Sequence, residues 1–481
     1  MTAAQPTEGS PAFSDWLVAT TKTFHGKPWL LHVSGRPHAL VLSSPQLFED
    51  VQRTFALQFE KVDSQFDTAG FDVHGGGVAS VSGSCLRPPM QIQRHLAAAV
   101  LTSPILREQA SKLVAKHVES LVKVLEDAAG DDKSQPRSPL DVTKLMRRFA
   151  MEVFVELGFG LQLGALSSSS EDSSAFEKAV DQVQALMPRR ASRSALAWKL
   201  ERLLRVGDEA TLSRSAAFVE TEILAAVEAK SKKRRGDSGC GSPLASGAGH
   251  VDMLDVIMKQ KRNSRSIKDP GFLAEFVLGL VVAARDSMAY TLSMCLHCLA
   301  QHPEEQEKLY EELCKAEESG KPHSSLVRLE AVVKETMRLF PTKPFVRRRA
   351  KTDVILSDNT FVAAKTEVAM DIYGMARSET VWGLGGAEFR PQRWIDVKTG
   401  NLRPASTYKF NAFLGGPQAC LGAEIALTEI KTILAVLINK VRFSPVDNET
   451  SCCNEETPVR SNGAVMVQIH RRRPSPPGQY S

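Results

Sequence analysis

Apolar residues recur at helical spacing through most of the central part of the chain. One such run consists of Leu113, Val114, Val118, Leu121 and Leu125. Residues three and four apart lie side by side on a helix, so this run predicts a helix with one buried face. A second run carries Leu196, Leu200, Leu203 and Leu204 beside the basic residues Lys199, Arg202 and Arg205. Similar spacing predicts that helices dominate again from residue 270 to residue 340.

Short β-prone runs near the N-terminus predict a hairpin. Residues 29–33 and 39–42 are apolar and flank a Ser-Gly-Arg-Pro segment with turn chemistry. Ser44 and Pro45 then predict a helix start, because serine suits the N-cap and proline the first helical position. Leu47, Phe48 and Val51 would form the apolar face of that helix.

After residue 340 the period shortens again, and short strands are predicted at 345–352, 354–356 and 360–362. Two polar stretches, 167–174 and 231–250, predict loops; the second begins with a basic run and continues rich in glycine and serine. Neither a repeat nor a clear linker is visible. The pattern therefore predicts a single domain over residues 1–481 that is mainly α with small β-sheets.

Composition narrows the class of protein. The chain has 481 residues, of which 43% are hydrophobic and 24% charged, so it can bury a large core and is not disordered as a whole. A formal net charge of +5 is too small to indicate a nucleic-acid partner. Eight cysteines are too few for a disulfide scaffold. The longest apolar stretch, 271–284, contains Glu275 and is shorter than the ~20 residues of a membrane span.

The most informative motif surrounds Cys420. Glycines on both sides of this cysteine leave room for a flat ligand to approach the main chain, and residues from Ala423 onward predict a helix. A cysteine just ahead of a helix N-terminus is favoured as a thiolate, which is a good axial ligand for haem iron. The pattern Phe-x-x-Gly-x-x-x-Cys-x-Gly arises by chance in roughly one in a thousand chains of this composition, so a buried structural cysteine explains it poorly.

Two further constellations agree with a haem site. Glu335 and Arg338 would share a helix face, and with Arg393 they can form a buried network, although Glu-x-x-Arg alone is common on surface helices. The small-residue segment 283–289 carries Asp286 and Ser287 inside a predicted helix, 272–299. A mid-helix serine can loosen the backbone and admit water. Read alone, this segment is better explained as an ordinary buried helix with an Arg/Asp pair.

Together these motifs resemble the cytochrome P450 family of haem-thiolate monooxygenases, over residues 13–458. Finer features at 373–377, 381–383, 389–394 and 408–413 resemble its fatty-acid ω-hydroxylase branch. The resemblance implies the cytochrome P450 fold, haem b, and electrons from NADPH through a separate flavoprotein reductase. It also implies a lipophilic substrate, O2, and a place on the cytosolic side of the endoplasmic reticulum membrane.

The resemblance assigns roles to matching residues. Cys420 would be the axial ligand of the haem iron, and Asp286 with Ser287 would relay protons during oxygen activation. Glu335, Arg338 and Arg393 would lock the core beneath the haem. The other residues implied to contact or shape the haem site are Phe413, Gly416, Gln418, Gly422, Arg94 and Ala283. Candidates for the substrate pocket are Phe276, Leu280, Phe345 and Val346, for which core packing is an equal alternative.

Several positions depart from the family pattern. Gln418 stands where arginine is usual, so it can hydrogen-bond a haem propionate without neutralising it. Met90 replaces a tryptophan, and Ala284 and Ser287 replace glycine and threonine. The segment 85–89 would break a helix. The N-terminal anchor of eukaryotic members is not visible, which predicts a cytosolic protein if that absence is genuine.

Three readings of function stay open at this point. The first is fatty-acid hydroxylation; the second is a haem protein with impaired turnover; the third is a haem-less helical binding protein. The leucine-rich basic segment 186–206 suits either an interfacial helix that contacts a membrane or a plain surface helix. Cys295 and Cys298 have the spacing of a zinc pair, but no second pair lies nearby in the sequence.

Overall fold

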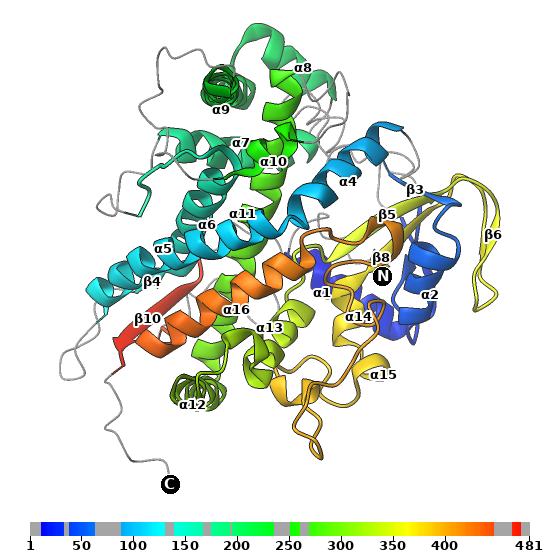
Figure 1. Cartoon of the computed structure of the whole chain (residues 1–481). Coiled ribbons are helices and arrows are strands. Elements are labelled where there is room, and N and C mark those ends of the chain that lie inside the picture. Colours follow the sequence, from blue (N-terminus) through cyan, green and yellow to red (C-terminus); the bar gives the residue numbers. More distant parts are fainter. Residues whose placement is uncertain are drawn as a thin grey trace. The chain divides into compact units, whose positions relative to one another are not determined.

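The computed structural model describes residues 11–32, 38–62, 88–129, 139–166, 175–192, 195–234, 251–259, 269–446 and 464–472. Helices make up most of the regular structure in these ranges (Figure 1). The α-helices are α1 (Pro11–Thr23), α2 (Pro45–Glu49), α4 (Pro88–Leu101), α5 (Pro104–Ala128), α6 (Val142–Phe159), α7 (Ala175–Ser192), α8 (Ala195–Leu204), α9 (Gly207–Arg234), α10 (Met253–Met258), α11 (Pro270–Gln301), α12 (Pro303–Ser319), α13 (Val327–Leu339), α14 (Ile372–Arg377), α15 (Glu379–Trp382) and α16 (Ala423–Lys440).

Short helices of other types and small strands complete the described part. The π-helix is η1 (Asp50–Thr54), and the 3-10 helices are η3 (His323–Ser325), η4 (Pro391–Trp394) and η5 (Gly416–Gln418). The strands are β1 (Trp29–Leu31), β2 (Ala39–Leu42), β3 (Phe59–Lys61), β4 (Leu140–Asp141), β5 (Phe345–Ala350), β6 (Val354–Ile355), β7 (Phe361–Val362), β8 (Glu367–Asp371), β9 (Val441–Ser444) and β10 (Met466–Arg471). The predicted fold class, mainly α with small sheets, is confirmed.

The chain divides into two compact units, each described here by itself. Unit 1 comprises Met1–Phe59, Val118–Arg147 and Ser287–Ser481, and unit 2 comprises Glu60–His117 and Arg148–Asp286. The divisions fall inside the long helices α5, α6 and α11, so each of these helices contributes to both units. The organisation as a single domain stays a prediction.

Unit 1 contains the largest sheet, with strand order β1-β2-β8-β5-β3. The predicted N-terminal hairpin is confirmed by antiparallel pairing of β1 and β2. Its predicted turn, residues 34–37, lies outside the described residues. The sequence pattern does not predict strand β8. It pairs in parallel with β2 and antiparallel with β5, so it joins the predicted N-terminal hairpin to the predicted strand that begins at residue 345. Two smaller sheets have the orders β4-β10-β9 and β6-β7.

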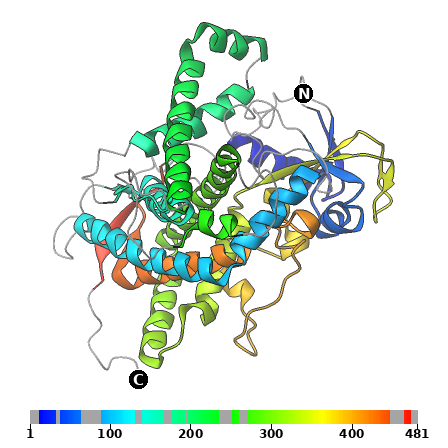
Figure 2. The ribbon, with the colours of Figure 1, turned by 45° about the horizontal axis from the view of Figure 1, so that its top comes forward.

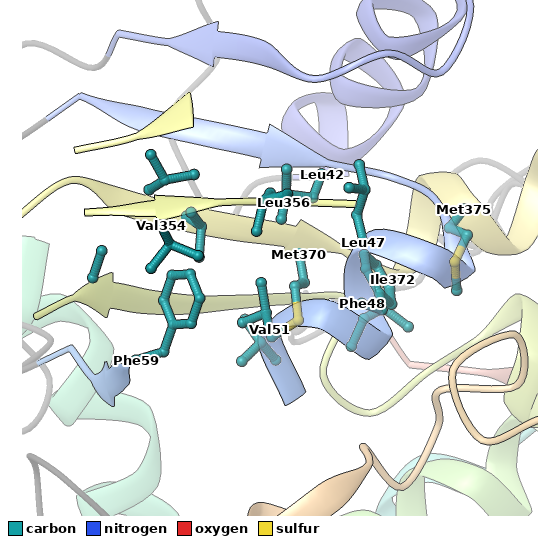
Figure 3. Packing of buried hydrophobic residues seen from close by; sticks show 14 residues of the cluster. Leu42, Leu47, Phe48, Val51, Phe59, Val354, Leu356, Met370, Ile372 and Met375 are labelled. Carbon is teal, nitrogen blue, oxygen red and sulfur yellow. The ribbon is translucent and has the colours of Figure 1, made fainter. Parts of the chain in front are cut away.

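A hydrophobic cluster lies between this sheet and the helix that follows the hairpin. The Ser44 side chain caps α2 by accepting a hydrogen bond from Leu47 N, as the Ser-Pro pair predicts. Figure 3 shows Leu47, Phe48 and Val51 grouped with Met370 at the sheet, and all four are buried. This packing holds α2 and η1 against the sheet.

Helices α12, α13, α14 and α16 are among the helices of unit 1. Helix α13 packs against α14, α16 and η4, and α12 packs against α16. Pro303 begins α12, and Gly320 ends it in a left-handed conformation with φ +63°. These helices place the Glu335 face of α13 beside the segment that contains Arg393.

Unit 2 is built around α7 and α9, which pack together and carry α8 beside them (Figures 1 and 2). The Arg190 side chain forms a buried bidentate pair with Glu209, with N–O distances of 2.9 and 2.6 Å. Its guanidinium also lies over the Trp198 ring, 4.4 Å from the centroid. Through these contacts one arginine of α7 is tied to α9 and to α8.

The predicted loop at 231–250 is wrong at its beginning. Residues 231–234 belong to the last turn of α9, and residues 235–250 lie outside the described residues, as does the predicted loop at 167–174. Lysine and arginine are good helix formers, and cations are favourable at a helix C-terminus. The basic run therefore prolongs the helix where its composition suggested a break. None of the helices in the described ranges is long and apolar enough to cross a bilayer.

Candidate active site

Cys420 lies in a tight loop between η5 and α16 in unit 1. Its main-chain N donates a hydrogen bond of 2.9 Å to Phe413 O, and Ala419 N donates one of 3.0 Å to Gly416 O. Gly422 is the N-cap of α16, so the helix predicted after the cysteine begins at Ala423. The Cys420 side chain is exposed, while Phe413 and Gln418, which precede it in the sequence, are half-buried.

The glycines ahead of Cys420 permit close contact with η1. Gly416 has φ +62°, and a Cβ atom there would lie 1.7 Å from Gln52 O. Gly415 is buried, and a Cβ atom there would lie 2.5 Å from Tyr408 Cε1. Only glycine meets both demands at position 416, because other residues rarely adopt this φ and none can share the space of a main-chain oxygen. The close approach of η1 is therefore enough to require glycine at position 416, whether or not a ligand lies beside the loop.

The surroundings of Cys420 suit a flat apolar group with a metal at its centre. Leu421 and Ile425 are half-buried although both are apolar, and they stand on the same loop and first helical turn as the exposed thiol. An accessible sulfur donor beside incompletely covered apolar side chains fits a porphyrin whose iron takes a thiolate ligand. A structural cysteine would instead be enclosed, as Cys295 and Cys298 are on α11.

Glu335 is the centre of a buried polar network in unit 1. Arg338 donates to it from Nε and Nη2 at 2.8 and 2.9 Å, and Arg393 Nε donates at 2.9 Å. Trp394 Nε1 and Arg390 N add bonds of 2.8 and 2.9 Å that the sequence did not predict. Burial alone would raise the pKa of Glu335, but these donors and the arginine charges hold it below its ordinary value. The structure thus brings all three predicted residues together.

The same network reaches the chain that leads into the cysteine loop. Arg338 also donates to the carbonyls of Ala376 and Gly386, the latter at 2.6 Å. A cavity of about 10 Å³ is lined by Met337 and Arg338 of α13 together with Phe410 and Asn411. That volume is about the size of one water. The helix that carries Glu335 and the approach to Cys420 are therefore close neighbours.

The predicted proton-relay residues lie in the middle of α11. Asp286 and Ser287 are half-buried, and Ala283 is exposed. Asp286 accepts a hydrogen bond of 3.3 Å from Arg285, whose buried guanidinium also pairs with Asp181 of α7. Ser287 O accepts a bond of 2.8 Å from the Thr291 hydroxyl. The Arg/Asp pair considered from the sequence is present, and Asp181 adds a partner that the sequence did not reveal.

The remaining predicted residues have varied surroundings. Arg94 is half-buried on α4, which begins at Pro88 because proline is tolerated in a first helical turn. Phe276 is buried and stacks on Phe272 with centroids 5.9 Å apart, while Leu280 is half-buried. Phe345 packs edge-on against Phe13, and Val346 belongs to the cluster of Figure 3. Core packing accounts for the last two, and their role in a substrate pocket stays a prediction.

The zinc-like cysteine pair has no metal-binding surroundings in the described part of the chain. No three His, Cys, Asp or Glu side chains there are grouped so as to hold a metal ion. Burial raises the pKa of Cys295 to about 12, which opposes the thiolate form that a metal needs.

Comparison with known proteins places these features in a family. A sequence model described as "Cytochrome P450" matches residues 15–470. The chain is 28% identical to Cytochrome P450 94C1 of Arabidopsis thaliana over 471 residues, which cover 95% of this chain and 89% of that protein. It is 27% identical to Cytochrome P450 704C1 of Pinus taeda over 435 residues, covering 84% and 79%. It is 26% identical to Cytochrome P450 94A2 of Vicia sativa over 475 residues, covering 95% and 87%.

Proposed function

The chain belongs to the cytochrome P450 family, and on that premise we propose that it hydroxylates a fatty acid, with the ω end of the acyl chain as the position attacked. The family fixes the reaction class: a monooxygenase inserts one atom of O2 into a C–H bond of a lipophilic substrate. The family also fixes the cofactor as haem b, with electrons supplied by NADPH through a reductase.

The observation that carries this proposal is the exposed Cys420 on a loop held against η1. In the proposal, Cys420 would hold the haem iron through its sulfur, and Gln418 and Arg94 are each a candidate for a hydrogen bond to a haem propionate. Haem ligated by a thiolate supplies the reductive cleavage of dioxygen. Asp286 would take protons from solvent, because its side chain is 42% exposed, and the Ser287 hydroxyl would pass them on.

A fatty acid is proposed as substrate because the motifs around residues 373–377, 389–394 and 408–413 resemble the ω-hydroxylase branch. An acyl chain offers mostly methylene groups, each worth ~0.8 kcal/mol on burial. Phe276 and Leu280 of α11 lie ahead of Asp286 by one to three helical turns and suit such a chain. In the proposal they line the pocket.

Helix α8 supports the further proposal that the protein contacts a membrane, at the cytosolic surface of the endoplasmic reticulum. The side chains of Leu196, Leu200, Leu203 and Leu204 are 56–82% exposed. Lys199, Arg202 and Arg205 accompany them, and such a combination favours the boundary between anionic headgroups and acyl chains. The Arg190 contacts described above hold α8 to the other helices of unit 2.

The test is a spectrum followed by product analysis. The reduced, carbon-monoxide-bound protein is expected to show a thiolate-type Soret band, and Cys420→Ser to abolish it. Cys314→Ser is the matched control. It makes the same cysteine-to-serine change on α12, outside the loop that carries Cys420. Fatty acids of several chain lengths are then supplied with NADPH and a reductase. A band without hydroxylated product would support a haem protein with impaired turnover, and no band in the wild type would support a haem-less binding protein.

A further inference from the structure

Gln52 contacts the cysteine loop from a distant part of the sequence. It lies in η1, a π-helix turn that packs against η5, and its side chain is only 6% exposed. π-helical turns are rare and frequently occur at functional sites. Membership of the family does not by itself assign a role to Gln52.

The Gln52 side chain forms a reciprocal amide pair with Asn411. Gln52 Nε2 donates to Asn411 Oδ1 at 2.9 Å, and Asn411 Nδ2 donates to Gln52 Oε1 at 3.1 Å. The second hydrogen on each amide nitrogen is also used, toward Met370 Sδ at 3.2 Å and Thr407 O at 2.9 Å. Asn411 is 2% exposed. A buried polar pair with satisfied donors selects one arrangement, because any shift leaves a donor without a partner.

The Gln52 main chain meets the same loop at a second place. Its carbonyl oxygen occupies the space that a Cβ atom of Gly416 would need, and its Oε1 lies 2.8 Å from the Cβ position of Gly415. Asn411 precedes Phe413 by two residues, and Phe413 O accepts the hydrogen bond from Cys420 N. Gln52 therefore contacts the loop on both sides of the residue that bonds to the cysteine.

We infer that Gln52 is a positioning residue for Cys420: its amide pair with Asn411 and its carbonyl against Gly416 set where the loop presents the thiolate. The inference rests on the proposed haem ligation, since it concerns what holds the ligand rather than what the ligand does. The hydrophobic cluster of Figure 3 holds η1 against the sheet through Val51. The position of the cysteine loop is therefore set relative to the sheet.

The experiment compares substitutions in the haem-loaded full chain. Gln52→Met keeps the size of the side chain but leaves the buried Asn411 amide without its partner. We expect the thiolate-type Soret band of the reduced carbon-monoxide complex to convert to the thiol-type band roughly tenfold faster than in the wild type, the size of effect that an unpaired buried amide produces. Gln52→Met combined with Asn411→Leu removes both partners and should recover part of that loss.

Gln306→Met is the matched control. Gln306 is also a buried glutamine. In the described part of the chain, its side chain hydrogen-bonds to main-chain atoms of Leu299 and Phe443. It should lower the free energy of unfolding without speeding the conversion of the Soret band. Equal conversion rates for Gln52→Met and Gln306→Met, at matched stability, would overturn the inference. Should Gln52→Met not fold, Asn411→Leu tests the pair from the loop side by the same comparison. A wild type without the thiolate band would refute the proposed function itself, which is a different result.

Discussion

Glu335 and Arg338 share two parallel hydrogen bonds, of 2.8 and 2.9 Å, and their side chains are 0% and 1% exposed. Both charged groups are shielded from water. Each is stabilised by the other, and Glu335 also accepts hydrogen bonds from Arg393 and Trp394. The pair therefore links α13 to residues 390–394, which precede the cysteine loop in the sequence.

Glu335→Gln should lower the free energy of unfolding by about 3–5 kcal/mol, because it leaves the buried Arg338 and the partly buried Arg393 without their shared countercharge. Denaturant unfolding of the haem-loaded protein measures this. Glu388→Gln is the control: that side chain is 64% exposed and lies 3.6 Å from Arg390, so its pair is worth less than about 1 kcal/mol. A difference of less than about 1 kcal/mol between the two variants would contradict the buried-network interpretation.

Gly416→Ala should release the cysteine loop from η1. The left-handed φ alone costs a non-glycine residue about 1–2 kcal/mol. The added methyl would also overlap Gln52 O, a main-chain atom that cannot rotate aside. Gly320→Ala is a close control, with φ +63° and nothing within 4 Å of its Cβ position. We expect Gly416→Ala to be the less stable variant by about 1–3 kcal/mol, and to be the only one of the two that loses the thiolate-type band. Equal behaviour would show that the close approach to Gln52 has no consequence.

Acid should remove a specific contribution to stability in unit 2. Burial alone would raise the pKa of Glu156, but hydrogen bonds from His117, Lys116 and Gln162 lower it to about 2. Its ordinary value is 4.5, so the unfolded chain takes up a proton before the folded one. The contribution is therefore complete above pH 4.5 and is lost as the pH falls toward 2.

The measurement is the free energy of unfolding of wild type and Glu156→Gln at several pH values. The advantage of the wild type should shrink by up to about 1.4 kcal/mol for each pH unit below 4.5. Glu388→Gln, at an exposed position, should give a difference from wild type that changes little with pH. A constant advantage of wild type over Glu156→Gln through this range would show that the carboxylate is not stabilised as its contacts indicate.

Membrane contact through α8 can be tested without disturbing the core. Leu200 and Leu203 are 56% and 78% exposed, so replacing both by serine should leave the free energy of unfolding nearly unchanged. Binding to anionic vesicles should fall about tenfold or more, because each leucine contributes more than 1 kcal/mol when buried in the interface. Binding should also weaken with salt, since the basic residues contribute electrostatically. The control replaces Leu384 and Val397 by serine. These side chains are 84% and 78% exposed and lie far from α8 in the sequence. Equal loss in both double variants would rule out α8 as the contact.

Local patterns along the chain determined much of the fold. The periodic residues of α5 are all buried, the hairpin pairs as expected, and Ser44 caps α2. These features depend on neighbours within a few positions, which a single sequence displays directly. Strand β8 was missed for the complementary reason: all five of its residues are buried, so it shows no alternation. At 231–234 composition was misleading, because the same basic residues that suit a loop also suit the last turn of a helix.

The sequence by itself determined the family and singled out Cys420 as the proposed haem ligand, because the motif around this cysteine is contiguous and its residue types are those that haem-thiolate chemistry requires. Only the tertiary structure decided what supports that cysteine. Gln52 meets Asn411 across 359 positions, and Arg285 meets Asp181 across 104. No local pattern marks such pairs, since a buried hydrogen bond is specified by how packed elements bring two side chains together and not by the residues on either side of each.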